Sequence, residues 1–283
     1  MTSLAEWLAQ ARQRLSHTAD QPSLEAQVLL AHVLQKPRPW VIAHGDHILD
    51  PNQINLLETS LRALQAGFPL PYLTGRQEFF GLEFTVSPQV LIPRPETELL
   101  VEHALAWLRT HPARRRAADI GTGSGCIAVT LAHHIPDLSL LAVDRSAAAL
   151  SVARQNAQRW QVSERIHWLQ SDLLSAVSAR VDLLCANLPY IPTHKLADLR
   201  VAQHEPRLAL DGGADGLDLI HTLLTQAADC LAPGGLILLE IEAEQPDSAL
   251  SLAQRCFPLA QSAVHTDLAG LPQFEGSNAW AVS

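Results

Sequence analysis

Residues 117–129 decide the fold, and they read Ala117-Ala118-Asp119-Ile120-Gly121-Thr122-Gly123-Ser124-Gly125-Cys126-Ile127-Ala128-Val129. A short apolar strand runs into alternating glycines, and an apolar segment of helical character follows at once. A strand, a glycine turn and a helix form the first unit of a doubly wound sheet, which binds ligands at the carboxyl edge of its strands. The sequence therefore predicts an α/β protein with a mostly parallel sheet.

The spacing of the glycines restricts the ligand. They follow the pattern G-x-G-x-G, which departs from the dinucleotide pattern G-x-G-x-x-G. Asp119 precedes the turn and places a negative charge where phosphates would be repelled. Glycines let a ligand approach the backbone, and a helix start offers free N–H groups. We expect a cationic ligand such as S-adenosylmethionine, held by Asp119, Gly121, Thr122, Gly123, Ser124 and Gly125.

Acidic residues follow the next two predicted strands. Residues 138–143 are an apolar strand that ends at Asp144, at the spacing of about 20 residues from the glycine turn at which an acid binds the ribose hydroxyls. Residues 166–170 form a third strand before Asp172 and Leu173. There we expect Asp172 to accept from an adenine amino group while Leu173 packs on the ring. Helix capping is the alternative interpretation of both aspartates.

A fourth apolar strand, residues 181–186, ends in Asn187-Leu188-Pro189-Tyr190. The side-chain oxygen of Asn187 and the carbonyl of Leu188 can each accept one N–H of a planar NH2 group, and Pro189 stiffens the turn. Tyr190 offers a flat face for an amide or a nucleobase. An ordinary Asn-x-Pro turn explains these residues equally well when they are taken alone. Beside the three other strand ends, they predict a methyl-acceptor site, in which Asn187 also borders the cofactor.

The ordered set of motifs resembles the PrmC/HemK family of class I S-adenosylmethionine methyltransferases, which methylate a glutamine of peptide-chain release factors. The most specific segments are residues 71–82, PYLTGRQEFFGL, and 91–98, LIPRPETE, which are similar to the family's linker hairpin and its Pro-Arg-Pro-Glu-Thr-Glu loop. The resemblance implies a seven-stranded, mostly parallel Rossmann-like sheet, S-adenosylmethionine as cofactor and release factors as partners. It also implies that Asn187, Leu188, Pro189 and Tyr190 are catalytic and bind the substrate together with Arg94 and Glu96.

Several positions depart from the family pattern. Leu188 stands where the first proline of Asn-Pro-Pro-Tyr is usual, and Glu242 stands where a glycine tends to follow Glu240. Residues 267–270, Asp-Leu-Ala-Gly, match the family, but the arginine that commonly follows is absent and Gln273 lies nearby. We expect these changes to affect catalytic efficiency and edge-strand detail more than the class of reaction.

Two other functions use the same motifs. N6-methylation of adenine in RNA or DNA needs the same acceptors on an extruded base, and the Leu188 variant is more typical of ribosomal RNA adenine dimethyltransferases. A formal charge of −9 argues against it, because phosphate contacts need a basic surface. The second alternative is a cofactor-binding interaction module without catalysis, which the intact Gly121, Asp144 and Asn187 disfavour.

The predicted secondary structure changes along the chain. Residues 1–75 show helical periodicity, with apolar residues at Leu4, Leu8, Ala11 and Leu15, then at Ala26, Leu29, Leu30, Val33 and Leu34, and a third helix predicted after Pro51. We expect a helical bundle there that docks the protein substrate. Residues 76–92 alternate around Gly81 as a β-hairpin linker, and residues 93–283 form the methyltransferase domain.

Composition bounds the remaining possibilities. A chain of 283 residues with 47% hydrophobic content can form one large core and a smaller domain. It contains no apolar run of about 18 residues and no cationic-then-apolar leader, so we expect a cytoplasmic protein without membrane contact, and a monomer. The cysteines are widely spaced among apolar neighbours, which is typical of reduced core residues, and no metal site is expected.

Overall fold

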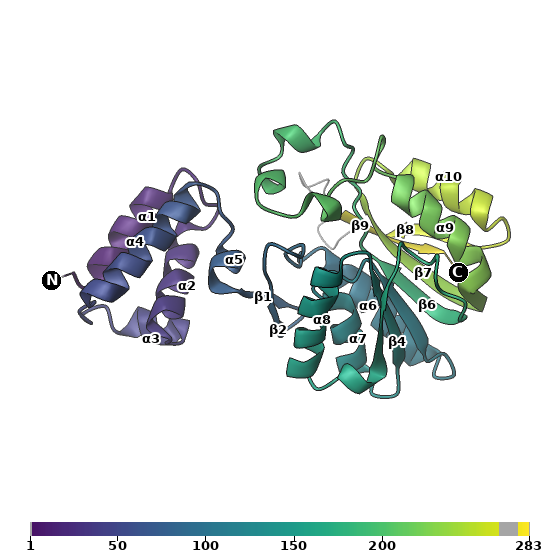
Figure 1. Ribbon diagram of the computed structural model, residues 1–283, viewed down its shortest axis with the longest axis horizontal. Coiled ribbons are helices and arrows are strands. Elements are labelled where there is room, and N and C mark those ends of the chain that lie inside the picture. Colours follow the sequence, from purple (N-terminus) through teal and green to yellow (C-terminus); the bar gives the residue numbers. More distant parts are fainter. Residues whose placement is uncertain (1, 266–276, 283) are drawn as a thin grey trace. The chain divides into compact units, whose positions relative to one another are not determined.

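The computed structural model describes residues 2–265 and 277–282 and divides the chain into two compact units, residues 1–76 and 77–283 (Figure 1). The first unit is helical, as the periodicity predicted. Its elements are α1 (Leu4–Leu15), α2 (Pro22–Leu34), α3 (Arg38–Ala43), α4 (Pro51–Gln65) and α5 (Leu70–Thr74). The apolar stripes of these helices face one another around a core that contains Trp7, Leu30, Leu57 and Leu61.

Helix caps fix the starts of two of these helices. Ser3 and Glu6 form a capping box at α1, and Asp50 and Gln53 form another at α4. Each cap satisfies backbone N–H groups that the first helical turn leaves free, and a cap of this kind contributes about 1 kcal/mol. The α4 start confirms a helix at Pro51, although the short α3 precedes it and makes it the fourth helix instead of the third.

The second unit is built on a sheet in the order β5-β4-β3-β6-β7-β9-β8. Its parallel central part consists of β3 (Arg116–Ile120), β4 (Ser139–Asp144), β5 (Ile166–Gln170), β6 (Val181–Ala186) and β7 (Leu231–Glu242). Strands β8 (Ser262–His265) and β9 (Ser277–Val282) extend it in antiparallel orientation. The chain reverses its direction of travel across the sheet between β3 and β6, which is where this architecture binds ligands. The doubly wound, mostly parallel sheet is therefore confirmed.

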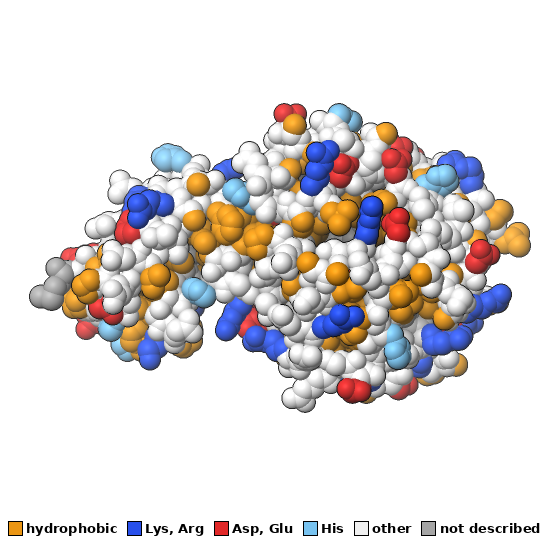
Figure 2. Space-filling model, viewed as in Figure 1, with side chains coloured by type: hydrophobic (Ala, Val, Ile, Leu, Met, Phe, Trp, Pro, Cys, Tyr) orange, Lys and Arg blue, Asp and Glu red, His pale blue; other side chains and the backbone are white. Residues whose placement is uncertain are grey.

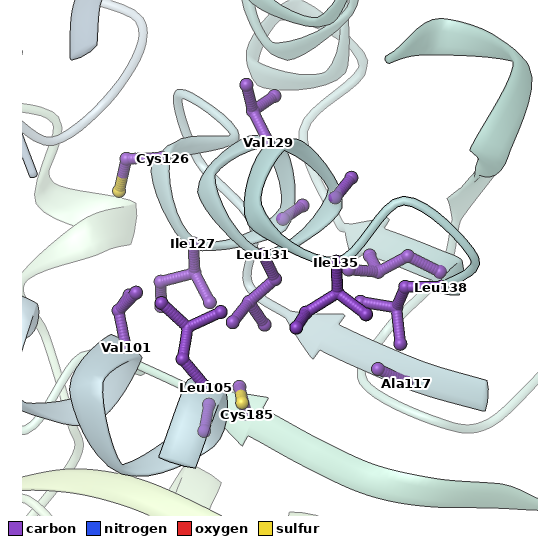
Figure 3. Close-up of a cluster of buried hydrophobic side chains, with 14 of the residues drawn as sticks. Val101, Leu105, Ala117, Cys126, Ile127, Val129, Leu131, Ile135, Leu138 and Cys185 are labelled. Atoms are coloured by element: carbon purple, nitrogen blue, oxygen red, sulfur yellow. The ribbon is translucent and has the colours of Figure 1, made fainter. Parts of the chain in front are cut away.

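Helices cover both faces of this sheet. One face packs against α6 (Thr97–Thr110), α7 (Cys126–His134) and α8 (Ala147–Arg159), and the other against α9 (Asp218–Cys230) and α10 (Pro246–Cys256). Figure 3 shows part of the first layer, where Val101 and Leu105 of α6 lie opposite Ile127 of α7. All residues of β6 are buried, because both faces of this central strand are covered.

A hairpin of β1 (Arg76–Phe79) and β2 (Leu82–Thr85) precedes the sheet. Phe79 and Phe84 are buried in the core shared with α6 and α7. Asn156 of α8 binds the edge of the hairpin, since its side chain accepts from the Thr85 N–H at 2.7 Å and donates to the Thr85 carbonyl at 3.0 Å. The hairpin is thus packed into the second unit. Short 3-10 helices lie at Ser163–Arg165, Leu196–Asp198, Arg200–Gln203 and Arg207–Ala209.

Candidate active site

A cavity of about 340 Å³ lies at the carboxyl ends of β3, β4 and β6, a volume typical of small-molecule sites. The ends of these strands supply one wall. The segments before α6 and before α9 supply the other, through residues such as Pro93, Arg94, Pro206 and Leu208. Of the residues proposed from sequence, the cavity is lined by Gly121, Thr122, Gly123, Ser124, Asp144, Asp172, Leu173, Asn187, Leu188, Pro189 and Arg94.

Asp119 lies behind the glycine turn and does not line the cavity. Its side chain is fully buried, and its Oδ2 accepts from the Thr122 hydroxyl at 2.6 Å and from the Ala128 N–H at 3.1 Å. Its Oδ1 is buried with no hydrogen-bond partner among the described residues. Burial raises the pKa of Asp119 to about 7. The carboxyl group expected to meet the ligand therefore holds the turn against the start of α7.

Two glycines of the turn have different reasons to be glycine. Gly121 has φ +75° and lines the cavity, where the absence of a side chain leaves the backbone open to a ligand. Gly125 does not line it. A Cβ there would lie 3.0 Å from the Ala153 Cβ of α8, so the close packing of α7 on α8 requires this glycine.

Asp144 combines a structural and a ligand-facing position. Its Oδ2 accepts from the Gly123 N–H at 2.9 Å and its Oδ1 from the Ser146 N–H at 2.8 Å. Burial raises its pKa. Each carboxylate oxygen keeps a lone pair beyond these bonds, so the group can also accept from the hydroxyls of a bound sugar.

The wall after β5 contains a strained leucine. Leu173 has φ +50°, a region that residues with a Cβ rarely adopt, and its side chain is buried on the cavity wall beside the exposed Asp172. Strained backbone of this kind is concentrated at ligand-binding positions. The backbone conformation is a signal for this site that residue types alone did not contain.

The turn after β6 is connected to two residues that the sequence analysis missed. The Asn187 Nδ2 donates to the Thr97 hydroxyl at 2.9 Å, and that hydroxyl donates to Glu240 Oε2 at 2.7 Å. Tyr190 lies outside the cavity lining, and its hydroxyl donates to Glu240 Oε1 at 3.3 Å. Glu240 gave one signal in the sequence, since an acid that directly follows an apolar run is rarely buried without a partner.

The remaining substrate candidates, Arg94 and Glu96, have different surroundings. The Arg94 guanidinium lines the cavity and pairs with the buried Glu205, with 2.5 Å between Nη2 and Oε1. Glu96 is exposed and lies outside the cavity lining. Glu205, in the long connector after β6, is a further residue that the sequence analysis missed.

The connector after Pro192 returns to brace the acceptor turn. The Ile191 N–H donates to the Leu210 carbonyl at 3.1 Å, and the Gly212 N–H donates to the Ile191 carbonyl at 2.9 Å. A Cβ at Gly212 would lie 2.7 Å from the Pro189 carbonyl oxygen, so only glycine fits there. The Gln245 side chain donates to the Tyr190 carbonyl at 3.0 Å. The turn is therefore held by its backbone as well as by its side chains.

Glu242, which stands where the family tends to have a glycine, is hydrogen-bonded to the same connector. The Lys195 Nζ donates to Glu242 Oε1 at 3.4 Å and to Glu244 Oε2 at 3.0 Å. Residues 267–270, with Gln273, lie outside the described residues.

The residues around the cavity fit S-adenosylmethionine. The glycine turn is open at Gly121, Asp144 presents carboxylate oxygens, and Leu173 gives an apolar wall for a base. Cys126 also lines the cavity, but burial raises the pKa of its thiol to about 12, which keeps it protonated and unreactive near neutral pH. In the part of the chain that the structure describes, no group of three or more His, Cys, Asp or Glu side chains is placed to hold a metal ion. No helix within that part has the length and apolar character to cross a membrane.

Comparison with known proteins adds a family assignment to this geometry. Residues 6–75 match the family model of the PrmC N-terminal domain, and residues 95–205 match the methyltransferase small domain. The chain is 42% identical over 272 residues to a release factor glutamine methyltransferase of Moorella thermoacetica, covering 95% of each chain. It is 39% identical over 240 residues to the Escherichia coli K12 protein of the same name, covering 83% of this chain and 84% of the other.

A solved structure supports the fold. The T. thermophilus 16S rRNA N2 G1207 methyltransferase, in complex with AdoMet and guanosine, superposes with a TM-score of 0.53 at 19% identity. The match covers 74% of this chain and 49% of that chain. At this identity the likeness concerns the sheet and its helices.

Proposed function

Because the chain belongs to the family of release factor glutamine methyltransferases, we propose that its cavity binds S-adenosylmethionine next to a glutamine side chain of a peptide-chain release factor. The protein methylates the side-chain amide nitrogen, N5, of the glutamine in the Gly-Gly-Gln motif. The observation that carries the proposal is that residues 187–189 lie on the wall of the same cavity as the glycine turn and Asp144. Cofactor and acceptor would therefore meet in one enclosure.

The cofactor half of the cavity is assigned to three strand ends. Asp144 accepts from the ribose hydroxyls, Asp172 and Leu173 hold the adenine, and the turn at Gly121–Gly123 admits the amino-acid part against the backbone. Asp119 and Gly125 keep that turn in place from behind. When bound, S-adenosylmethionine supplies an electrophilic methyl group on a sulfonium sulfur.

The acceptor half solves a chemical difficulty. A carboxamide nitrogen is a poor nucleophile, because its lone pair is delocalised into the carbonyl. Asn187 Oδ1 and the Leu188 carbonyl accept the two N–H bonds, which fixes the nitrogen in position and orientation. Such preorganised polar groups act without rearrangement at the moment of reaction. Pro189 restricts the turn, and Tyr190 supports it from outside the cavity through its hydrogen bond to Glu240.

The protein substrate contacts more than the cavity. Arg94 lines the cavity and Glu96 is exposed two residues further along the chain, and we assign both to binding of the release factor chain. The helical unit, residues 1–75, docks the body of the release factor. Residues 76–92 join this unit to the methyltransferase domain, residues 93–283.

The remaining properties of the proposed enzyme follow from its charge and its family. We propose that the protein acts as a cytoplasmic monomer with no nucleic acid or membrane partner. A net charge of −9 supports the absence of a nucleic-acid partner, as does the mixture of basic and acidic side chains on the face drawn in Figure 2. The relatives, named for release factor glutamine methylation, do not favour adenine methylation or a non-catalytic module.

Mass spectrometry tests the proposal directly. Purified release factor and an RNA pool are incubated separately with the protein and labelled cofactor. We expect one methyl group on the Gly-Gly-Gln glutamine, none when that glutamine is replaced by asparagine, and none in the RNA. An unmodified release factor beside methylated adenine in the RNA would overturn the assignment.

A further inference from the structure

A series of hydrogen-bonded polar side chains joins three elements beside the cavity. Glu240 ends the apolar run of β7, Thr97 begins α6, and Asn187 follows β6. The Thr97 hydroxyl lies 2.7 Å from Glu240 Oε2, and the Asn187 Nδ2 lies 2.9 Å from that hydroxyl. Thr97 and Glu240 are each 2% exposed, so water does not compete for these bonds.

The hydrogen bonds of this series have a fixed direction from donor to acceptor. An ionised carboxylate only accepts hydrogen bonds, and a hydroxyl has a single proton to donate. Because the Thr97 proton goes to Glu240, the Thr97 oxygen can only accept from Asn187. The Asn187 NH2 group must then face Thr97, and its Oδ1 must face away from Thr97.

This direction matters because the two ends of an asparagine amide have nearly the same size and shape, and sterics alone do not choose between them. A flipped Asn187 would place its oxygen against a hydroxyl that is already donating elsewhere. Its NH2 would then meet the NH2 of the acceptor, where two donors face each other. Only one of the two orientations is useful for accepting an N–H.

We propose that Thr97 and Glu240 are positioning residues that lock the amide of Asn187 with Oδ1 presented to the acceptor NH2 group, an inference that rests on the proposed function of Asn187. Glu240 can only accept, so the Thr97 hydroxyl donates to it. The Thr97 oxygen is then left to accept from the Asn187 NH2 group. The same carboxylate accepts from the Tyr190 hydroxyl through Oε1 at 3.3 Å. The two polar side chains of the acceptor turn, Asn187 and Tyr190, are therefore both oriented by one buried carboxylate.

The role explains why a carboxylate is buried at this point. A buried charge destabilises a fold unless hydrogen bonds satisfy it, and both oxygens of Glu240 accept one. An apolar residue at position 240 would fill the space without that requirement. It would leave Thr97 free to rotate and Asn187 free to flip.

The first test compares three substitutions of buried threonines. Thr97→Val keeps the shape and removes the hydroxyl, whereas Thr97→Ser keeps the hydroxyl. Thr130→Val is the matched control, since Thr130 is fully buried in α7 and its hydroxyl has no partner among the described residues. We expect Thr97→Val to lower kcat on release factor at least tenfold while the cofactor Kd changes less than twofold. Thr97→Ser and Thr130→Val should stay within threefold of the parent in kcat.

The second test reads the amide itself and does not depend on turnover. In the parent, NMR of the Asn187 side-chain NH2 should show one proton shifted downfield and protected from solvent exchange. Thr97→Val should abolish that signature, and Thr97→Ser should preserve it. Where Thr97→Val does not fold, Glu240→Met replaces it: methionine keeps the length of the side chain and removes both acceptor oxygens, so the same losses are expected.

The outcomes separate the inference from the proposed function. A Thr97→Val protein with parental kcat, or with an unchanged Asn187 NH2 signature, overturns the inference. A parent that leaves the release factor glutamine unmethylated overturns the proposed function, while the NMR comparison still decides whether Thr97 sets the amide. A loss of kcat in Thr97→Val that Thr97→Ser restores, together with loss of the NH2 signature, supports the inference.

Discussion

The side chain of Leu188 lies directly over Gly121: a Cβ at Gly121 would come within 2.9 Å of Leu188 Cδ2. The contact follows from the sheet, in which Ile120 of β3 pairs with Ala186 of β6, so the two strands end side by side. The turn assigned to the cofactor and the turn assigned to the acceptor are thus packed on each other. A change at Gly121 should act on both.

Gly121→Ala should weaken cofactor binding at least tenfold, which corresponds to about 1.4 kcal/mol. The new methyl group would displace Leu188 and intrude on the ligand, and φ +75° costs a residue with a Cβ roughly 1 kcal/mol or more. Gly81→Ala is the control, because Gly81 has φ +72° and its added Cβ meets nothing within 4 Å. Calorimetric titration should show normal affinity for Gly81→Ala. Equal affinity in both variants would contradict the assignment.

Much of the sheet could be predicted because its strands are apolar runs bounded by turn residues. The strands predicted at 166–170 and 181–186 match β5 and β6 residue for residue. By contrast, the apolar run at 236–239 covers only part of β7, Leu231–Glu242. Pro233, Gly234 and Gly235 interrupt the apolar pattern, but the backbone pairs with β6 on both sides of them through a register shift. A sequence pattern does not show pairing that resumes after a bulge.

The site was less predictable than the fold. Residues at the four strand ends were found because each apolar run stops at a glycine or at a polar residue that the sequence shows directly. Thr97, Glu205 and Glu240 were missed, because only tertiary packing brings them to Asn187 and Arg94. Asp119 and Tyr190 were expected to touch ligands, but their immediate hydrogen bonds go to Thr122 and Glu240. A motif identifies a region, whereas the direction of each side chain depends on what packs around it.

Asp144→Ala should raise the cofactor Kd at least tenfold. The change removes the proposed acceptors for the ribose hydroxyls, and it also releases the Gly123 and Ser146 N–H groups. Asp144→Asn retains one acceptor oxygen and should have an intermediate affinity. Titration of S-adenosylmethionine and of S-adenosylhomocysteine should give the same order for parent, Asn and Ala. Unchanged affinity in the Ala variant would exclude Asp144 from the cofactor site.

Asn187→Ala should retain cofactor affinity within about threefold and lose turnover by about 100-fold or more, the effect of removing one preorganised polar group from a reacting centre. In the proposed site, Asn187 contributes an acceptor for the substrate amide, whereas the cofactor is assigned mainly to the other strand ends that line the cavity. Single-turnover methylation of release factor, paired with cofactor titration, measures the two effects separately. Turnover within tenfold of the parent would show that the Leu188 carbonyl suffices.

Asp119 should make the stability of the protein depend on pH. Burial raises its pKa from 3.8 to about 7, so between these values the folded protein holds a proton that the unfolded chain has lost. The free energy of unfolding should therefore fall as pH rises from about 4 to 7, by up to roughly 4 kcal/mol from this group. Asp119→Asn should lack this fall. Urea denaturation of both proteins at several pH values measures the difference, and a pH-independent difference would show that Asp119 is ionised throughout.

Glu205 should control how fast the cofactor leaves. Its Oε2 accepts from the Ile92 N–H at 3.0 Å, and its Oε1 pairs with Arg94. One carboxylate therefore joins the segment before α6 to the connector after β6, and both segments line the cavity. Glu205→Ala should increase the cofactor dissociation rate at least tenfold and destabilise the fold by about 1–3 kcal/mol, because it leaves a buried N–H unpaired. Glu205→Gln retains an acceptor for Ile92, so its dissociation rate should lie between those of the parent and Glu205→Ala.

Arg207→Gln is the control. It breaks an ion pair with Asp211 in the same connector, and the Arg207 side chain in that pair is 70% exposed. Exposed pairs contribute at most about 1 kcal/mol, so its dissociation rate should equal that of the parent. Stopped-flow displacement of bound cofactor measures these rates. A Glu205→Ala rate within twofold of the parent would show that the two segments close the cavity without this link.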